Sequence, residues 1–227
     1  MLSAIIVAAG SSRRMGFDKL FAPLAGKPVI AHSLHAFEKA DCVGEIILVG
    51  RSQQVAELQA FVCASGSNKV LQVVEGGEHR QDSVRAGLNV LTSRVEYVAV
   101  HDAARPLITP DQITRVFRFA CQHGGATLAE PITDTLKRAD ANGFVSVGID
   151  RERLYAMQTP QIFSRRLLED AYAAVVANKL LITDEVSAVE HLGGKVFLVS
   201  NDQPNLKITF PRDLSLAECY FAQRPGL

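Results

Sequence analysis

Runs of like charge, paired cysteines and long apolar stretches are all missing from this sequence. Its 24 basic residues balance its 24 acidic ones, which argues against binding nucleic acid or anionic membranes through overall charge. The four cysteines form no CxxC pair and lie at no metal-site spacing with histidine, so we expect free thiols in a reducing compartment. No apolar run reaches the roughly 18 residues of a membrane span, and Met1-Leu2-Ser3 leads directly into a strand. We therefore expect a cytoplasmic protein without nucleic-acid or membrane partners.

Short apolar runs alternate with helical patterns through the first half of the chain. Leu2–Ala8 is apolar throughout, as in a strand buried on both faces. Pro28 opens a helix whose Ile30, Leu34 and Phe37 share one face. Further strands and helices are expected in turn at Glu45–Val49, Val55–Val62, Val70–Val74, Asp82–Leu91, Tyr97–Val100 and Asp111–Cys121. This alternation predicts a Rossmann-like α/β fold, in which a mostly parallel sheet carries helices on both faces.

A hairpin interrupts this alternation. Asn142-Gly143 is a two-residue turn signal between Thr133–Arg138 and Phe144–Ile149. Val145, Val147 and Ile149 would share an apolar face of this hairpin. Either a partner subunit or the chain's own domain must cover this face, and we favour the partner subunit. Later elements are expected at Ser164–Ala177, from Asp184, at Lys195–Val199 and from Pro211. We expect one domain over residues 1–227, with a protruding β-arm at about 132–152.

The segment directly after the first expected strand has the composition of a phosphate-binding loop. Ala8-Ala9-Gly10 is small enough for backbone N–H groups to approach an anion. Three cations follow in the same loop: Arg13, Arg14 and Lys19. A triphosphate needs such cations, because charge on the transferred phosphoryl group and on departing pyrophosphate must be neutralised. The segment is neither a Walker A motif nor a GxGxxG motif, and a solvated basic turn is the alternative.

Two further polar segments are expected on the same edge of the sheet. Asp102 could hold a hydroxyl group or a metal ion and Arg105 a phosphate, although a structural Asp–Arg pair would give the same pattern. His101 is expected to pack or to hydrogen-bond and not to act as a catalyst. The Gly76-Gly77 segment leading to Ser83 could approach a nucleotide closely and contact a base edge, a signal that is weak by itself.

Seven segments occur in an order that resembles one family of enzymes. They are AAGSSRRMG-x-DK, GG-x-x-R-x-DSV, HDAARP, DTLKR, TPQ-x-F, TDE-x-S and NLKIT, spread from about residue 4 to about residue 220. In this order they resemble the 2-C-methyl-D-erythritol 4-phosphate cytidylyltransferases of the non-mevalonate isoprenoid pathway. The first segment is shared with many nucleotidyltransferases, whereas HDAARP, DTLKR and NLKIT together are far more specific.

The resemblance implies a reaction and a set of site residues. CTP and methylerythritol 4-phosphate would give cytidine diphosphate-methylerythritol and pyrophosphate, with Mg²⁺ held by ligands that stay unknown. Arg14, Lys19 and Lys207 would act on the α-phosphate. The nucleotide would contact Ala8, Ala9, Gly10, Gly77, Glu78 and Ser83. The acceptor would contact Asp102, Arg105, Thr135, Thr159 and Thr183, together with Arg151 from the arm of the other subunit of a homodimer.

Two other interpretations stay open. A cytidylyltransferase for another polyol phosphate, such as ribitol 5-phosphate, would share the triphosphate loop and the arm, although Ala104 and the DTLKR stretch favour methylerythritol. A non-catalytic nucleotide-binding protein of the same fold has less need of Arg14, Lys19 and Lys207. No general base is expected for the transfer, because an ionised substrate phosphate is already a nucleophile and catalysis would depend on alignment and charge stabilisation.

Overall fold

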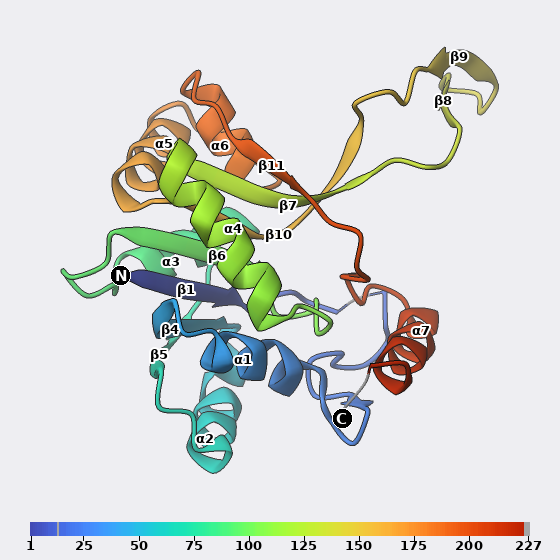
Figure 1. The fold of residues 1–227 in the computed structure, drawn as a ribbon. Coiled ribbons are helices and arrows are strands. Elements are labelled where there is room, and N and C mark those ends of the chain that lie inside the picture. Colours follow the sequence, from blue (N-terminus) through green and yellow to red (C-terminus); the bar gives the residue numbers. More distant parts are fainter. Residues whose placement is uncertain (13, 225–227) are drawn as a thin grey trace.

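A computed structural model describes residues 1–12 and 14–224 of the chain (Figure 1). The strands of its large sheet are β1 (Leu2–Val7), β4 (Val43–Gly50), β5 (Val70–Glu75), β6 (Tyr97–Asp102), β7 (Gly125–Pro131), β10 (Tyr155–Ser164) and β11 (Phe197–Ser200). The helices are α1 (Val29–Lys39), α2 (Val55–Ser65), α3 (Arg80–Leu88), α4 (Pro110–His123), α5 (Arg165–Ala177), α6 (Glu185–His191) and α7 (Pro211–Ala222). Two short ribbons pair β2 (Pro23–Leu24) with β3 (Lys27–Pro28), and β8 (Leu136–Ala139) with β9 (Val145–Ile149).

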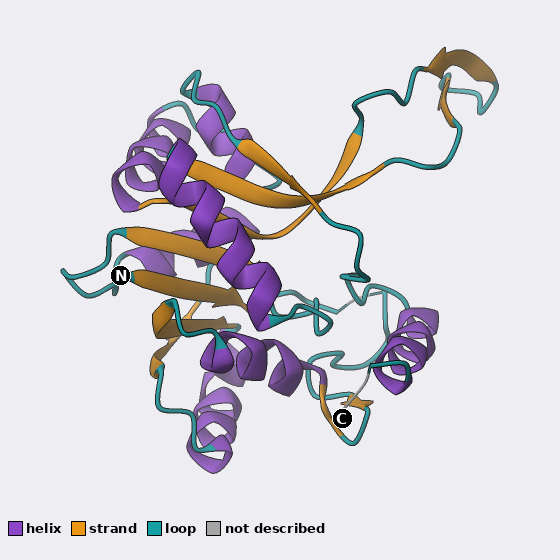
Figure 2. Ribbon diagram, viewed as in Figure 1, coloured by secondary structure: helices purple, strands orange, loops and turns teal. Residues whose placement is uncertain are grey.

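The large sheet has seven strands in the order β11-β7-β10-β6-β1-β4-β5. Every neighbouring pair is parallel except the two pairs made by β10, which runs antiparallel to β6 and β7. Helices lie on both faces of this sheet (Figure 2). The predicted α/β fold with a mostly parallel sheet is thereby confirmed.

Alternate residues of β1 explain why both faces are covered. Leu2 and Ile6 point into one core, and Ile5 points into the other. The first core contains the buried sides of α1, α2 and α4, and the second contains those of α3, α5 and α6. The apolar stripe predicted for α1 lies in the first core. Helix α7 instead packs in a third cluster, with Leu107 and Ile208.

Strand β10 was not predicted from the sequence. Gln158-Thr159-Pro160-Gln161 lacks apolar alternation, and proline is normally excluded from a central strand because it cannot donate to the ladder. The pairing of β10 with β7 shifts register between Met157 and Gln161, so Pro160 lies where the ladder is interrupted. This irregularity allows a polar segment to run between β6 and β7.

The predicted β-arm is present as the ribbon of β8 and β9, which follows β7 and precedes β10 in the chain. This ribbon extends away from the large sheet (Figure 1). Its apolar side chains do not pack on the chain's own domain, because Phe144, Val145, Val147 and Ile149 are 72%, 69%, 51% and 37% exposed. The alternative that the hairpin covers its apolar face within one chain is therefore wrong.

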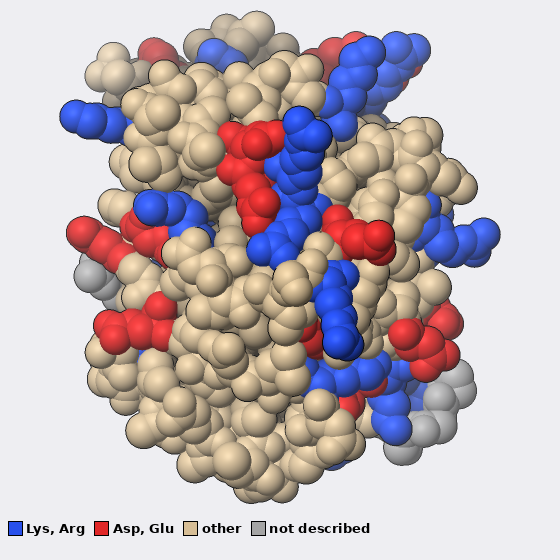
Figure 3. Space-filling view, turned by 90° about the vertical axis from the view of Figure 1, so that its left-hand side faces the viewer, with Lys and Arg blue, Asp and Glu red and all other residues tan. Residues whose placement is uncertain are grey.

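The side of the molecule where the N-terminus lies carries both charges. Lys and Arg side chains lie there beside Asp and Glu side chains (Figure 3). A surface that mixes both signs produces a weaker field than a single-sign patch. Among the described helices, none has the length and apolar character required to cross a bilayer.

Candidate active site

The loops after β1 and β6 meet at the carboxyl edge of the sheet. The two strands pair with Val7 beside Asp102, and the Ala103 amide donates to the Val7 carbonyl at 3.0 Å. The Ala8 amide donates to the Val49 carbonyl of β4 at 2.7 Å. These bonds hold the small-residue loop beside the HDAARP segment, on the edge where open α/β sheets bind ligands.

A first pocket of about 440 Å³ lies over this edge. All the residues predicted to contact the nucleotide line it: Ala8, Ala9, Gly10, Gly77, Glu78 and Ser83. Gly76 allows the loops to meet, because a Cβ there would lie 2.5 Å from Ser83 Oγ and 2.9 Å from Ala9 Cβ. Any larger residue at this position would push the loops apart.

A second pocket of about 380 Å³ adjoins the first. Its lining includes most of the residues predicted to contact the acceptor: Asp102, Arg105, Thr159 and Thr183. The two pockets share Arg80, Asp102 and Lys207, which we call the junction. The site therefore consists of two neighbouring pockets with charged groups between them.

Asp102 is the anion around which the junction cations gather. Its Oδ2 accepts from Lys207 Nζ at 2.6 Å, and its Oδ1 accepts from Arg80 Nε at 3.1 Å. Arg105 Nε lies 4.0 Å from Oδ2. Burial alone would raise the pKa of Asp102, but the positive charges of Arg80, Lys207 and Arg105 outweigh burial and hold this pKa well below 3.8. The carboxylate is therefore ionised throughout the physiological range.

This pKa predicts how stability depends on pH. Because the unfolded chain protonates Asp102 more readily than the folded chain, its contribution is complete above about pH 3.8 and is lost as pH falls toward the folded pKa. We expect Asp102→Asn to remove an acid-sensitive contribution on the order of 2 kcal/mol. Urea unfolding of both proteins near neutrality and at about pH 3 measures the part lost by pH 3, which is about 1 kcal/mol. The same loss of stability in wild type and in the variant between these two pH values would contradict the proposed pairing.

Lys19 reaches the first pocket from the loop after β1. Its Nζ donates to the Ile208 carbonyl at 2.7 Å, which ties this loop to the NLKIT segment. Burial lowers the pKa of Lys19, and the nearby positive charge of Lys207 lowers it further. An anion bound in the first pocket would favour the charged form of Lys19, so the site is suited to polyphosphate.

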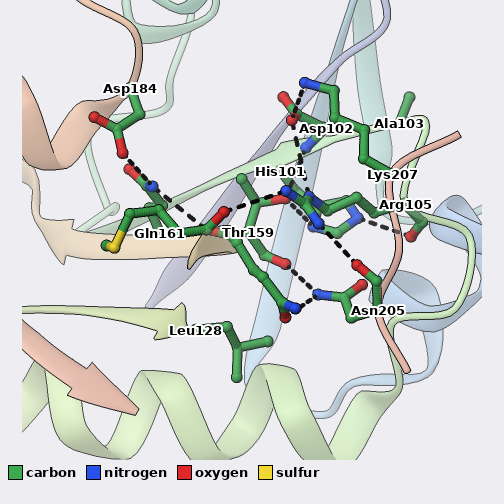
Figure 4. Close-up of polar contacts among 12 residues, drawn as sticks. His101, Asp102, Ala103, Arg105, Leu128, Thr159, Gln161, Asp184, Asn205 and Lys207 are labelled. Atoms are coloured by element: carbon green, nitrogen blue, oxygen red, sulfur yellow. Dashed lines mark hydrogen bonds and ion pairs between the residues drawn. The ribbon is translucent and has the colours of Figure 1, made fainter. Parts of the chain in front are cut away.

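Hydrogen bonds fix the walls of the second pocket (Figure 4). Thr159 Oγ1 accepts from the Asp102 amide at 3.1 Å and lies 3.0 Å from His101 Nδ1. Arg105 donates to the Asn205 carbonyl at 2.7 Å, and Asn205 Nδ2 donates to the Thr159 carbonyl at 2.9 Å. Burial lowers the pKa of His101 to about 3, so this imidazole is neutral. His101 therefore packs and hydrogen-bonds, as the sequence predicted.

Three predicted site residues line neither pocket. Arg14 is exposed, and its guanidinium lies 5.4 Å from the centre of the Phe210 ring. Thr135 precedes β8 and Arg151 follows β9, so both belong to the arm. Arg13, the remaining cation of the basic loop, lies outside the described residues. The roles of these three residues stay predictions, as do those of the predicted residues that line the pockets.

Arg80 lines both pockets and is a candidate site residue that sequence reasoning missed. It lies within the GG-x-x-R-x-DSV segment, and its charge beside a glycine pair was the available signal. Its carboxylate partners, Asp102 and Glu185, are 22 and 105 residues away in the chain. No local spacing indicates such contacts, because separate elements supply the two partners.

This site has a mostly parallel sheet beneath it, a small-residue loop at the carboxyl edge of that sheet and cations between two pockets. These features together are those of a nucleotidyltransferase. Residues 2–223 match the 2-C-methyl-D-erythritol 4-phosphate cytidylyltransferase family, and the chain belongs to this family. The expected family resemblance is thereby confirmed, and the chain is a cytidylyltransferase.

Individual relatives agree with this membership. The chain is 40% identical over 222 residues to 2-C-methyl-D-erythritol 4-phosphate cytidylyltransferase of Caldanaerobacter subterraneus, which covers 96% of this chain and 98% of that protein. It is 41% identical over 218 residues to the enzyme of the same name from Dehalococcoides mccartyi, covering 96% and 94%. The crystal structure of 4-diphosphocytidyl-2C-methyl-D-erythritol synthase from Anaerococcus prevotii superposes with a TM-score of 0.86 at 27% identity, covering 98% and 99%.

Proposed function

We propose that the protein transfers CMP from CTP to 2-C-methyl-D-erythritol 4-phosphate and releases pyrophosphate, in the non-mevalonate isoprenoid pathway. The observation that carries this proposal is the junction of two pockets at Arg80, Asp102 and Lys207. The first pocket has small residues and Lys19, which suit a nucleoside triphosphate. The second has Arg105 and hydroxyl side chains, which suit a phosphorylated polyol. A reaction between two anions requires cations where they meet.

The transfer follows from this arrangement. A phosphate oxygen of the acceptor attacks the α-phosphorus of CTP, and the bond to pyrophosphate breaks in line with the new P–O bond. Lys19 and Lys207 neutralise the charge that grows on the pentacoordinate phosphorus. We propose that Arg14 leaves the Phe210 ring and joins them when the triphosphate is bound. The acceptor phosphate is already ionised, so the neutral His101 is not needed as a base.

We propose that Mg²⁺ enters with the triphosphate. Mg²⁺ usually keeps several waters and binds through one or two carboxylates together with substrate phosphates. Among the described residues, no group of three or more His, Cys, Asp or Glu side chains is placed to hold a metal ion. Asp102 lines both pockets and could add one ligand, although both its oxygens already face cations. Bound Mg²⁺ would reduce the negative charge of the departing pyrophosphate.

We also propose a homodimer in which each arm covers the neighbour's second pocket. The apolar side chains of β9 are exposed in one chain, and their burial would contribute about 25 cal/mol per Å² of apolar surface. Thr135 and Arg151 would then serve the acceptor of the partner subunit, which agrees with their absence from the lining of the described pockets. The free cysteines suit a cytoplasmic location for this dimer.

Acceptor choice is the direct test of the proposed function. With CTP and Mg²⁺, pyrophosphate release should favour methylerythritol 4-phosphate over ribitol 5-phosphate by on the order of 10–200-fold in kcat/KM, as expected for substrates that differ by small groups. The opposite preference would assign the second pocket to ribitol 5-phosphate. It would leave the fold and the proposed chemistry of transfer unchanged. Tight CTP binding without release of pyrophosphate from CTP in the presence of either acceptor would favour the non-catalytic alternative.

A further inference from the structure

Arg80 connects two carboxylates that come from different parts of the fold. It begins α3, its Nε donates to Asp102 Oδ1 at 3.1 Å, and its terminal nitrogens donate to Glu185 Oε1 and Oε2 at 2.7 and 3.0 Å. All three guanidinium nitrogens are therefore used. A planar guanidinium can bind one carboxylate through two nitrogens and present the third to another group, which a lysine cannot do.

Glu185 is a buried carboxylate for which the proposed chemistry has no direct use. It is 0% exposed at the start of α6. Besides Arg80, the Tyr172 hydroxyl of α5 donates to Glu185 Oε1 at 2.9 Å. The backbone amide of Glu185 donates to Gln161 Oε1 at 3.0 Å. A buried charge is costly unless it is paired and hydrogen-bonded, as it is here. These bonds fix Glu185, and Glu185 in turn fixes the plane of the Arg80 guanidinium.

The same contacts determine how Asp102 is presented to the cleft. Arg80 occupies Oδ1, so the carboxylate cannot rotate freely about its terminal bond. Oδ2 faces Lys207, whose side chain is 40% exposed and therefore free to exchange partners. When an acceptor enters the second pocket, Oδ2 can accept a hydroxyl hydrogen bond while Lys207 turns to the phosphate between the two pockets.

We propose that Arg80 is a positioning residue for the acceptor, held by Glu185 and Tyr172, and that it aims Asp102 Oδ2 at an acceptor hydroxyl. This inference rests on the proposed transfer to a polyol phosphate. Removing the negative charge of Glu185 frees Arg80 to turn, and Asp102 then loses its fixed orientation. Arg80 and Asp102 line both pockets, but no hydrogen bond among the described residues connects Glu185 to the small-residue loop that holds the nucleotide. We therefore expect the larger loss in acceptor recognition.

The test compares Glu185→Gln and Tyr172→Phe with wild type in the pyrophosphate assay. We expect KM for methylerythritol 4-phosphate to rise about tenfold in Glu185→Gln and by less in Tyr172→Phe, as lost buried hydrogen bonds predict. The affinity for CTP, measured by equilibrium binding, should change less than about twofold, a difference of ~0.4 kcal/mol. Glu169→Gln removes a carboxylate that pairs with Arg165 on exposed α5 surface and serves as the matched control.

The outcomes separate this inference from the function on which it rests. A lower fraction of active enzyme with an unchanged acceptor KM would make the Arg80–Glu185 pair merely structural and would overturn the inference. Tyr172→Phe keeps both charges, so it decides the matter if Glu185→Gln does not fold. Wild-type protein that transfers CMP to neither acceptor would instead overturn the proposed function, and the inference with it.

Discussion

Replacing Lys19 with alanine is expected to lower kcat by about 10²–10³-fold, the loss typical of one electrostatic group aimed at developing charge. The ammonium group lies in the first pocket and is partly removed from water, so its interaction with the transferred phosphoryl group is weakly screened. KM for CTP should change less than kcat, because the charge on the α-phosphoryl group is greatest in the transition state. Steady-state kinetics with saturating acceptor measures both constants.

Two controls separate this role from a loss of folding. Among the described residues the Lys19 side chain makes one hydrogen bond, to the Ile208 carbonyl, so Lys19→Ala should unfold within a few degrees of wild type in a thermal scan. Lys39→Ala changes an exposed lysine at the end of α1 and should leave kcat unchanged. Near-normal turnover by the Lys19 variant would show that the cation has no part in the chemical step.

Replacing Arg151 with alanine is expected to inactivate the homodimer, and a second variant is expected to rescue it. If Arg151 of the partner subunit completes each site, mixing Arg151→Ala chains with Lys19→Ala chains creates one intact site in each mixed dimer. Random exchange places half of the chains in mixed dimers, and only one of the two sites in each mixed dimer is intact. About a quarter of wild-type activity should therefore return. Neither variant alone should exceed about 1% of wild type, the loss expected from removing one electrostatic contact.

The complementation needs its own controls. Co-expression of the two variants with different affinity tags yields mixed dimers directly, so slow exchange of subunits cannot hide the result. Arg153→Ala changes an exposed cation directly after the arm, and this variant should stay active without mixing. Among the described residues, the ion-pair partner of Arg153 is its neighbour Glu152. Purified mixed dimers that remain inactive would mean that Arg151 serves its own site, or that the arm does not form the dimer.

Local patterns in the sequence were sufficient for most of the elements. The apolar run from Leu2 buries on both faces as β1, and Thr109 caps α4 through a hydrogen bond from the Gln112 amide at 3.2 Å. Asp184 caps α6 in the same way, accepting from the Ser187 amide at 3.0 Å. Such features depend on residues close in the chain, so the sequence alone contains them. The small-residue loop and Lys19 were likewise placed by the rule that ligands bind at the carboxyl ends of parallel strands.

Three features could be decided only by the tertiary structure. Strand β10 has no alternation and contains Pro160, and it exists because β6 and β7 offer it partners on both sides. The bridge from Asp102 through Arg80 to Glu185 joins β6, α3 and α6, and its energy depends on distances that no spacing in the sequence encodes. Arg151 carries a local signal as part of a hairpin, yet the fold holds it away from the pockets of its own chain. The sequence by itself therefore determined the periodic elements and the residues at strand ends, whereas packing between distant segments decided which charges meet, because electrostatic interactions depend on separation in space and on burial.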